Sequence, residues 1–249
     1  MKSYETTIAL AESLKLKGIV THMDELLSHA ERQKHSHMTF LKSLLNTEIT
    51  DRQNRRLRRN LAGAHFPVEK QFDAFDFSKL KGIGKSEVNG LLDCRWIDKN
   101  ENLLFFGPPG IGKTHLAISL GLNAVEKGYT VCFERVTNLM KLLKTAQIQR
   151  TADFRIKKIQ KSSLFIIDEI GYTPIDRKEA NLFFNLVSEL YEKASIIITS
   201  NKGFDNWAEM RGDEIMTTAL LDRLLHHAQI FNLNGESYRL NNNQKTEEK

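Results

Sequence analysis

The sequence lacks an apolar run long enough to cross a bilayer, which requires roughly 20 consecutive apolar residues. Its N-terminus carries Glu5 and Glu12 and lacks the pattern of a secretory signal peptide. Cysteine is scarce, since Cys94 and Cys132 are the only two and lie far apart without metal-ligand spacing. We therefore expect a soluble, cytoplasmic protein with no membrane partner, whose cysteines pack in the core.

Internal repeats are also missing, and the histidines near the N-terminus have no cysteines or carboxylates at ligand spacing, which argues against a zinc site. The 249 residues, of which 41% are hydrophobic, suffice for one mid-sized α/β domain and a smaller appendage. The net charge of +5 favours an anionic partner.

A glycine-rich loop follows the apolar segment Asn102–Phe106 and precedes a segment with helical periodicity. Two glycines flank four residues and are followed by lysine and threonine, the phosphate-loop pattern in which backbone N–H groups surround phosphate oxygens at a helix N-terminus. Lys113 is expected to reach the outer phosphates, and the Thr114 hydroxyl to face Mg²⁺. The residues expected to bind ATP are Gly107, Pro108, Pro109, Gly110, Ile111, Gly112, Lys113, Thr114 and His115.

A second apolar strand, Leu164–Glu169, ends in two adjacent acids. Asp168 is expected to bind magnesium together with Thr114, and Glu169 to polarise the attacking water. Acids also end strands at ordinary turns, but the phosphate loop upstream favours the catalytic interpretation. The pair argues against a small-molecule kinase, in which a water-activating glutamate would be harmful.

Two further positions are catalytic candidates. Asn201 follows a third apolar strand and is expected to orient water against the γ-phosphate, although such residues also serve in turns. Arg223 lies just before the last expected strand and is a candidate arginine finger supplied to a neighbouring subunit. Its alternative role is a surface ion pair with Asp222. The expected catalytic set is thus Lys113, Glu169, Asn201 and Arg223.

The order of elements predicts an α/β fold. Residues 1–66 contain three helical segments and form a small helical domain for DNA or partner binding, residues 67–240 form the ATPase domain, and residues 241–249 form a disordered tail. Alternating strands and helices indicate a five-stranded parallel sheet with helices on both faces. The expected strands are residues 102–106, 129–133, 163–167, 195–199 and 229–233.

Two basic segments are candidates for contact with duplex DNA. The expected binding is largely independent of sequence, because contacts to phosphates position a protein without reading bases. The alternative is a solvated helix face. The first segment comprises Arg52, Arg55, Arg56, Arg58 and Arg59, and the second Lys141, Lys144, Arg150, Arg155, Lys157 and Lys158.

Four motifs resemble the IstB/DnaC group of AAA+ ATPases, and within it the IstB-like helper ATPases of insertion-sequence transposons. These motifs are GPPGIGKTHLA from Gly107, FIIDEIGY from Phe165, IITSNK from Ile197 and ALLDRLLHH from Ala219; the likeness extends over about residues 14–240. It implies an ATP- and Mg²⁺-dependent ATPase that assembles head to tail on target DNA and delivers it to the transposase of the same element. Only Asn234–Lys249 follow the last strand, too few for the usual helical lid, so the lid is expected to be absent or truncated and a sensor role for Arg239 stays open.

Two alternatives remain open. A DnaC-like loader of a replicative helicase would share the ATPase motifs but bind single-stranded DNA; the segments Leu14–Gly18 and Ala64–Pro67 favour the IstB pattern instead. A phosphotransferase acting on a small substrate would need a lid arginine cluster, which the sequence does not show.

Overall fold

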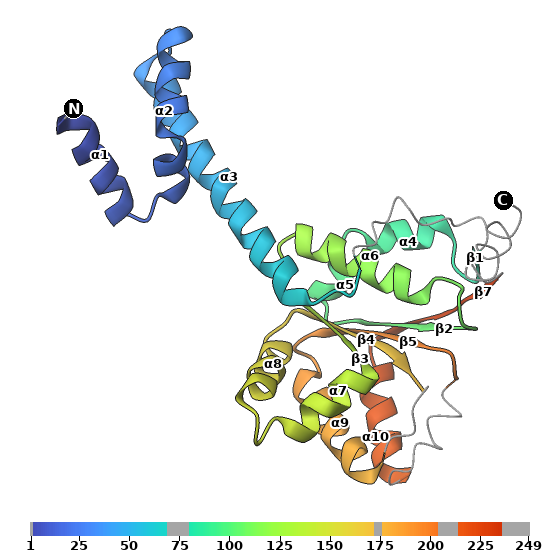
Figure 1. The fold of residues 1–249 in the computed structure, drawn as a ribbon. Helices are drawn as coiled ribbons and strands as arrows, with labels where there is room; N and C mark the ends of the chain where they lie inside the picture. The colour runs from blue at the N-terminus through green and yellow to red at the C-terminus, as the bar shows by residue number, and fades with distance from the viewer. Residues whose placement is uncertain (1, 69–79, 172–175, 204–213, 236–249) are drawn as a thin grey trace, which may run out of the picture. The chain divides into compact units, whose positions relative to one another are not determined.

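The computed structural model describes residues 2–68, 80–171, 176–203 and 214–235. The chain divides into two compact units, Met1–Arg59 and Asn60–Lys249, and each is described by itself (Figure 1). None of the helices in the described ranges is long and apolar enough to cross a bilayer.

The first unit is helical, as predicted. It contains α1 (Lys2–Ser13), α2 (Lys17–Arg32) and most of α3 (His37–Ala64). The sequence places a domain boundary at Phe66–Pro67, whereas the compact units divide between Arg59 and Asn60. The last turn of α3 belongs to the second unit because its Gly63 carbonyl oxygen accepts a 2.8 Å hydrogen bond from Arg155 there.

Three apolar residues on one face of α3 are about half exposed rather than buried against α2. Leu41, Leu45 and Ile49 are 47%, 52% and 53% exposed. Instead, the first turn of α2 rests on a polar part of α3, where the buried carboxylate of Glu48 accepts hydrogen bonds from the backbone N–H groups of Gly18 and Ile19. A Cβ on Gly18 would lie 2.7 Å from Asp51 Cβ, so only glycine permits this close approach.

The second unit is built on a five-stranded parallel sheet in the order β3-β4-β5-β2-β6, which confirms the predicted sheet. A two-stranded antiparallel sheet joins β1 (Leu80–Lys81) to β7 (Asn234–Gly235). The central strands are fully buried because helices cover both faces. Their bounds are β2 (Asn102–Phe106), β3 (Val131–Arg135), β4 (Leu164–Ile170), β5 (Ser195–Ser200) and β6 (Ala228–Asn232).

One face of the sheet is covered by α6 (Lys113–Glu126), with α4 (Lys85–Leu91) and α5 (Arg95–Asp98) beside it (Figure 1). The other face is covered by α7 (Val136–Thr145), α8 (Arg150–Gln160), α9 (Arg177–Leu190) and α10 (Glu214–Leu225). The N-terminus of α9 has a capping box between Asp176 and Glu179. Cys94 and Cys132 are buried and free, and burial raises the pKa of each thiol.

Candidate functional site

The phosphate loop connects the C-terminal end of β2 to the N-terminus of α6. Gly107, Gly110 and Gly112 have φ of 146°, 84° and 101°, a region that side-chain-bearing residues seldom adopt. A Cβ on Gly107 would lie 2.1 Å from the carbonyl oxygen of Leu233, so this position also needs glycine for space. The loop therefore has the backbone freedom that wrapping a phosphate group requires.

Lys113 opens α6 and is only 9% exposed. Its Nζ donates hydrogen bonds to the carbonyl oxygens of Gly107 (2.6 Å) and Pro108 (2.8 Å), so the ammonium group lies against the loop. When a phosphate group enters the loop, the Lys113 ammonium group can exchange its hydrogen bonds to these carbonyl oxygens for stronger ones to phosphate oxygens.

Asp168 lies near the C-terminal end of β4 and is 0% exposed. Its Oδ1 accepts hydrogen bonds from the hydroxyl groups of Thr114 (2.7 Å) and Thr199 (2.6 Å). Its Oδ2 is buried and has no hydrogen-bond partner among the described residues. A buried carboxylate oxygen without a donor carries a large desolvation cost, which a divalent cation would offset. The carboxylate and the Thr114 hydroxyl are hard oxygen donors, so the residues present fit Mg²⁺.

Glu169 stands in a strained backbone conformation next to Asp168. Its φ is 65°, and the pairing of β4 with β5 is irregular between Ile167 and Ile170. Such strain costs about 1–3 kcal/mol and persists where the surrounding structure enforces it, as at active sites. The Glu169 carboxylate is partly exposed, and its Oε2 lies 3.8 Å from Arg135 Nε at the end of β3. The bulge thus turns this side chain out of the sheet while Asp168 stays buried.

Asn201 follows the C-terminal end of β5, and its Oδ1 is buried without a hydrogen-bond partner in the parts of the chain that the structure describes. An unsatisfied buried acceptor is uncommon, and a water molecule or ligand bound at this position would satisfy it. The neighbouring Ser200 differs, because its hydroxyl already contacts the carbonyl oxygens of Ile170 and Lys202. Of these two residues, Asn201 is therefore the one with bonding capacity left.

Thr199 is a site residue that the sequence motifs did not identify. Its hydroxyl donates to Asp168 Oδ1 at 2.6 Å and accepts from the Glu169 backbone N–H at 3.0 Å. One side chain on β5 thereby fixes both acidic residues of β4. The only signal in the sequence was its place in the segment Ile198-Thr-Ser-Asn201, where a threonine is also a common strand residue.

Replacing Thr199 with valine is expected to lower the free energy of unfolding by about 1–3 kcal/mol, because the buried Asp168 carboxylate and the Glu169 N–H would each lose a hydrogen-bond partner. The shape of the side chain is nearly unchanged, so the effect reports the hydrogen bonds. Urea denaturation followed by circular dichroism measures it, with the exposed Thr151→Val on α8 as the control. Equal stability of Thr199→Val and the parent protein would contradict this role.

Arg223 is in the last turn of α10, just before β6 begins. Its Nη1 donates to the Ala219 carbonyl oxygen at 3.1 Å, and its guanidinium lies 4.9 Å from the centroid of the Phe184 ring. The phosphate loop follows the opposite, C-terminal end of β2, and a five-residue strand spans about 16 Å. Arg223 therefore lies at the other edge of the sheet from the phosphate loop of its own chain.

Arg155 requires a correction to the predicted DNA contacts. It is only 6% exposed, and its guanidinium pairs with Glu134 Oε1 at 2.6 Å and donates to the carbonyl oxygens of Gly63 and Phe133. It is thus a buried link between the end of α3, β3 and α8, and cannot reach a nucleic acid. The prediction failed because its neighbours in the sequence are exposed lysines, whereas helical periodicity turns Arg155 inward with Ile156 and Ile159.

The other residues of the second basic segment that were predicted to contact DNA lie at the surface. Lys144 Nζ is 2.7 Å from Glu179 Oε1, and this hydrogen bond raises the pKa of Lys144. Lys157 pairs with Asp153 at 2.8 Å. Both lysine side chains remain exposed. Ion pairs at the surface contribute little to stability, so these pairs are not structural links. The exposed set is Lys141, Lys144, Arg150, Lys157 and Lys158.

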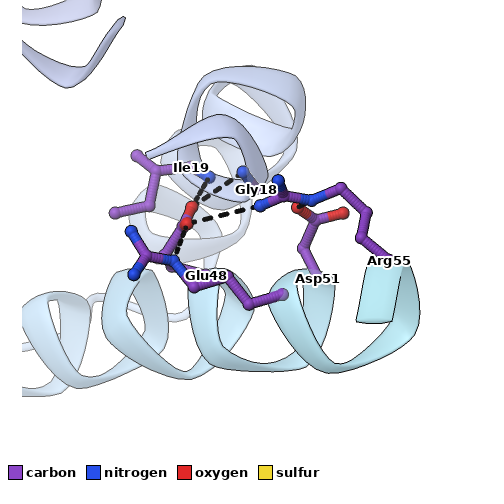
Figure 2. A network of polar contacts seen from close by, with 6 residues as sticks. Gly18, Ile19, Glu48, Asp51 and Arg55 are labelled. Atoms are coloured by element: carbon purple, nitrogen blue, oxygen red, sulfur yellow. Dashed lines mark hydrogen bonds and ion pairs between the residues drawn. The ribbon is translucent and has the colours of Figure 1, made fainter. Parts of the chain in front are cut away.

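In the first unit, two of the predicted arginines contact a shared carboxylate network (Figure 2). Arg52 Nε lies 2.6 Å from Glu48 Oε1, and Arg55 pairs with both Asp51 (2.7 Å) and Glu48 (3.6 Å). Burial alone would raise the pKa of Glu48, but Arg52 and the N–H groups of Ile19 and Gly18 lower it. The two arginine side chains remain 55% and 43% exposed, so they join the helices and still face solvent.

The other arginines of this segment, Arg56, Arg58 and Arg59, are exposed on α3. All five predicted arginines are therefore exposed.

Among curated proteins, the chain is 41% identical over 95% of its length to a protein of Pseudomonas aeruginosa named as an insertion sequence IS21 ATP-binding protein, of which it covers 89%. It is 39% identical over 95% of its length to an insertion sequence IS5376 ATP-binding protein of Geobacillus stearothermophilus, of which it covers 94%.

Solved structures show the same fold at low identity. DnaI matches with a TM-score of 0.56 and 16% identity, covering 67% of this chain and 89% of DnaI. AMPPCP-bound DnaA from Aquifex aeolicus matches with a TM-score of 0.54 and 17% identity, covering 74% of this chain and 56% of DnaA. With the five-stranded order and phosphate loop, these likenesses confirm the AAA+ P-loop fold. A family model described as "IstB-like ATP binding protein" matches residues 9–246, and the chain belongs to this family of insertion-sequence ATP-binding proteins.

Proposed function

We propose that this protein is a Mg²⁺-dependent ATPase that assembles on duplex target DNA and delivers it to the transposase of the same insertion sequence. The observation that supports ATP hydrolysis is a pair of buried oxygens without a hydrogen-bond partner among the described residues. Asp168 Oδ2 lies on β4 and Asn201 Oδ1 lies just after the neighbouring β5, at the edge of the sheet that bears the phosphate loop. A cation and a water molecule at these atoms would satisfy both.

Each site residue then has a defined task. Thr114 and Asp168 would hold magnesium, which when bound neutralises phosphate charge. Lys113 binds the outer phosphate oxygens, and Asn201 orients the attacking water. The Glu169 carboxylate accepts the proton of that water, and its partly exposed position leaves it free to reach solvent. Thr199 holds the backbone of Glu169 and the carboxylate of Asp168 in register.

A direct test of this function is an ATPase assay with duplex DNA and purified transposase. We expect phosphate release to depend on Mg²⁺ and to increase when both partners are present. Stimulation by a replicative helicase and single-stranded DNA, with none by transposase and duplex DNA, would instead favour the helicase-loader alternative.

Assembly is proposed to be head to tail because Arg223 lies at the sheet edge opposite to the phosphate loop. An arginine there can serve only the nucleotide of a neighbouring protomer, and repetition of such a contact produces rings or helical filaments. The local contacts with Ala219 and Phe184 are weak enough to be exchanged for a phosphate oxygen.

Replacing Arg223 with alanine is expected to leave ATP binding within about twofold of the parent, a change of about 0.4 kcal/mol, while ATP-dependent assembly and turnover are lost. Titration with a fluorescent ATP analogue and size-exclusion chromatography with light scattering measure the two effects. The exposed Arg95→Ala serves as control. ATP-driven oligomers of Arg223→Ala with full ATPase activity would overturn the assignment.

DNA binding is proposed to use the exposed cations of both units. The groups that support it are Arg52, Arg55, Arg56, Arg58 and Arg59 on α3 and Lys141, Lys144, Arg150, Lys157 and Lys158 on α7 and α8. Contacts of this kind release counterions from duplex DNA, so affinity falls steeply with salt.

Replacing Arg58 and Arg59 together with alanine is expected to make the slope of log affinity against log salt shallower by about 1–2, because each lost phosphate contact removes about 0.9 from its magnitude. Fluorescence anisotropy with two unrelated duplexes at several salt concentrations measures this slope. Lys42→Ala, at an exposed position in the first half of α3, should leave it unchanged. An unaltered slope in the double variant would exclude both arginines from the DNA contact.

A further inference from the structure

Among the described residues, a second cluster of metal-ligating groups lies outside the ATP site. It consists of Glu192, which follows α9, and of His226 and His227, which follow α10. These residues precede β5 and β6, whereas the phosphate loop follows β2, so the cluster lies at the opposite edge of the parallel sheet. We propose that Glu192, His226 and His227 form a binding site for a divalent transition metal of the Zn²⁺ class.

The three side chains lie close together in the structure. Each offers one ligand atom, and these atoms lie within 4.8 Å of one another. The ring centroids of His226 and His227 are 4.0 Å apart. Zinc–ligand bonds of about 2.0–2.2 Å place tetrahedral ligands roughly 3.4 Å apart, so small side-chain rotations are sufficient for coordination. The exposure of all three residues leaves them room for these rotations.

Neighbouring residues hold this arrangement. The Tyr191 hydroxyl forms a 2.8 Å hydrogen bond with His226 Nδ1. Histidines that bind metals commonly have one ring nitrogen fixed in this way, which leaves the other for the ion. Glu192 has φ of 57°, and its carbonyl oxygen accepts a 2.9 Å hydrogen bond from Asn100 Nδ2. The backbone that presents the carboxylate is therefore fixed from a separate segment of the chain.

The ligand atoms of Glu192, His226 and His227 favour a transition metal over Mg²⁺. Two imidazole nitrogens and one carboxylate suit Zn²⁺ and its neighbours in the transition series, whereas Mg²⁺ prefers oxygen ligands only. Of the charged groups that act on the adjacent Tyr191, Glu192 and Asp222 are anionic and Arg223 is cationic. Three protein ligands would leave a fourth position for water. An ion there would join the end of α9 to the end of α10.

The site is tested by isothermal titration of the full-length protein with zinc chloride after removal of metals by a chelator. We expect one Zn²⁺ per chain, bound equally well in excess Mg²⁺, and a rise in the midpoint of thermal unfolding with zinc. His227→Ala and Glu192→Gln should each weaken binding by at least about tenfold, while His22→Ala, which removes a half-exposed histidine of the first unit, should not.

All of the ligands are exposed, so the variants should unfold at the parental temperature in the absence of zinc, which separates loss of a ligand from loss of fold. Replacement of zinc by Co²⁺ should give the visible absorption of a four-coordinate ion, and His226→Ala should abolish it. The proposal is overturned if no zinc binds, if Mg²⁺ displaces it, or if the His227 and Glu192 variants bind as tightly as the parent. None of these outcomes depends on ATPase activity.

Discussion

Replacing Lys113 with alanine is expected to weaken ATP binding by at least about 100-fold and to abolish ATP-driven assembly with it. The ammonium group lies against the carbonyl oxygens of Gly107 and Pro108, where phosphate oxygens would bind. Each hydrogen bond to a charged group contributes about 1.5–3 kcal/mol, and the side chain offers at least two. Equilibrium titration with ATP and Mg²⁺ measures the affinity, and light scattering measures the assembly.

The control for Lys113→Ala is Lys127→Ala. Lys127 follows the other end of the same helix and is exposed, so it tests the loss of a positive charge without the loss of the phosphate contact. The control should bind ATP and assemble as the parent does. If Lys113→Ala kept the parental ATP affinity, the phosphate loop would not be the nucleotide site.

Replacing Glu169 with glutamine is expected to retain ATP binding and slow hydrolysis by about 10²- to 10⁴-fold, the usual contribution of a general base. Glutamine keeps the shape of the side chain and the strained backbone position but accepts no proton from water. Because the triphosphate then persists, the DNA-bound oligomer should accumulate. Single-turnover phosphate release and retention of labelled DNA in gel filtration measure the two effects.

Glu126→Gln, at the exposed end of α6, is the matched control and should hydrolyse ATP at the parental rate. A Glu169→Gln protein that also does so would show that another group activates the water. A variant that loses ATP binding as well would show that Glu169 has a role in binding, which its position beside Arg135 does not suggest.

The ATP site could be predicted best from the sequence. Its motifs are local, and the chemistry of ATP binding explains why each residue type stands at its position. The glycines between Gly107 and Gly112 have the positive φ values that the pattern requires. Burial of β2, β4 and β5 follows from their uninterrupted apolar residues, which predict a parallel sheet covered on both faces. The capping box of Asp176 and Glu179 at the start of α9 is likewise a local pattern, with its two side chains three residues apart.

Interactions between distant segments were not accessible. Arg155 had the appearance of a surface cation, and only the fold shows that Glu134 and the end of α3 enclose it. Thr199 reaches Asp168 from another strand, 31 residues away along the chain. The contact of α2 with α3 depends on Gly18 and the buried Glu48, which lie 30 residues apart along the chain.

Assignments in the segments 69–79, 172–175, 204–213 and 236–249 lie outside the described residues. They include the tail at 241–249 and the open question of Arg239. The expectation of an absent or truncated helical lid also rests largely on residues 236–249, which are outside the described ranges. The roles of Asn201 and Arg223 stay predictions, for which the unsatisfied amide oxygen and the position at the far sheet edge provide the structural support.

Sedimentation velocity of the full-length protein with duplex DNA, Mg²⁺ and a non-hydrolysable ATP analogue tests the central claim most directly. Because nucleotide is proposed to join the phosphate loop of one protomer to Arg223 of the next, we expect large protein–DNA assemblies that form only when all three components are present. Single protein chains under the same saturating conditions would contradict the account.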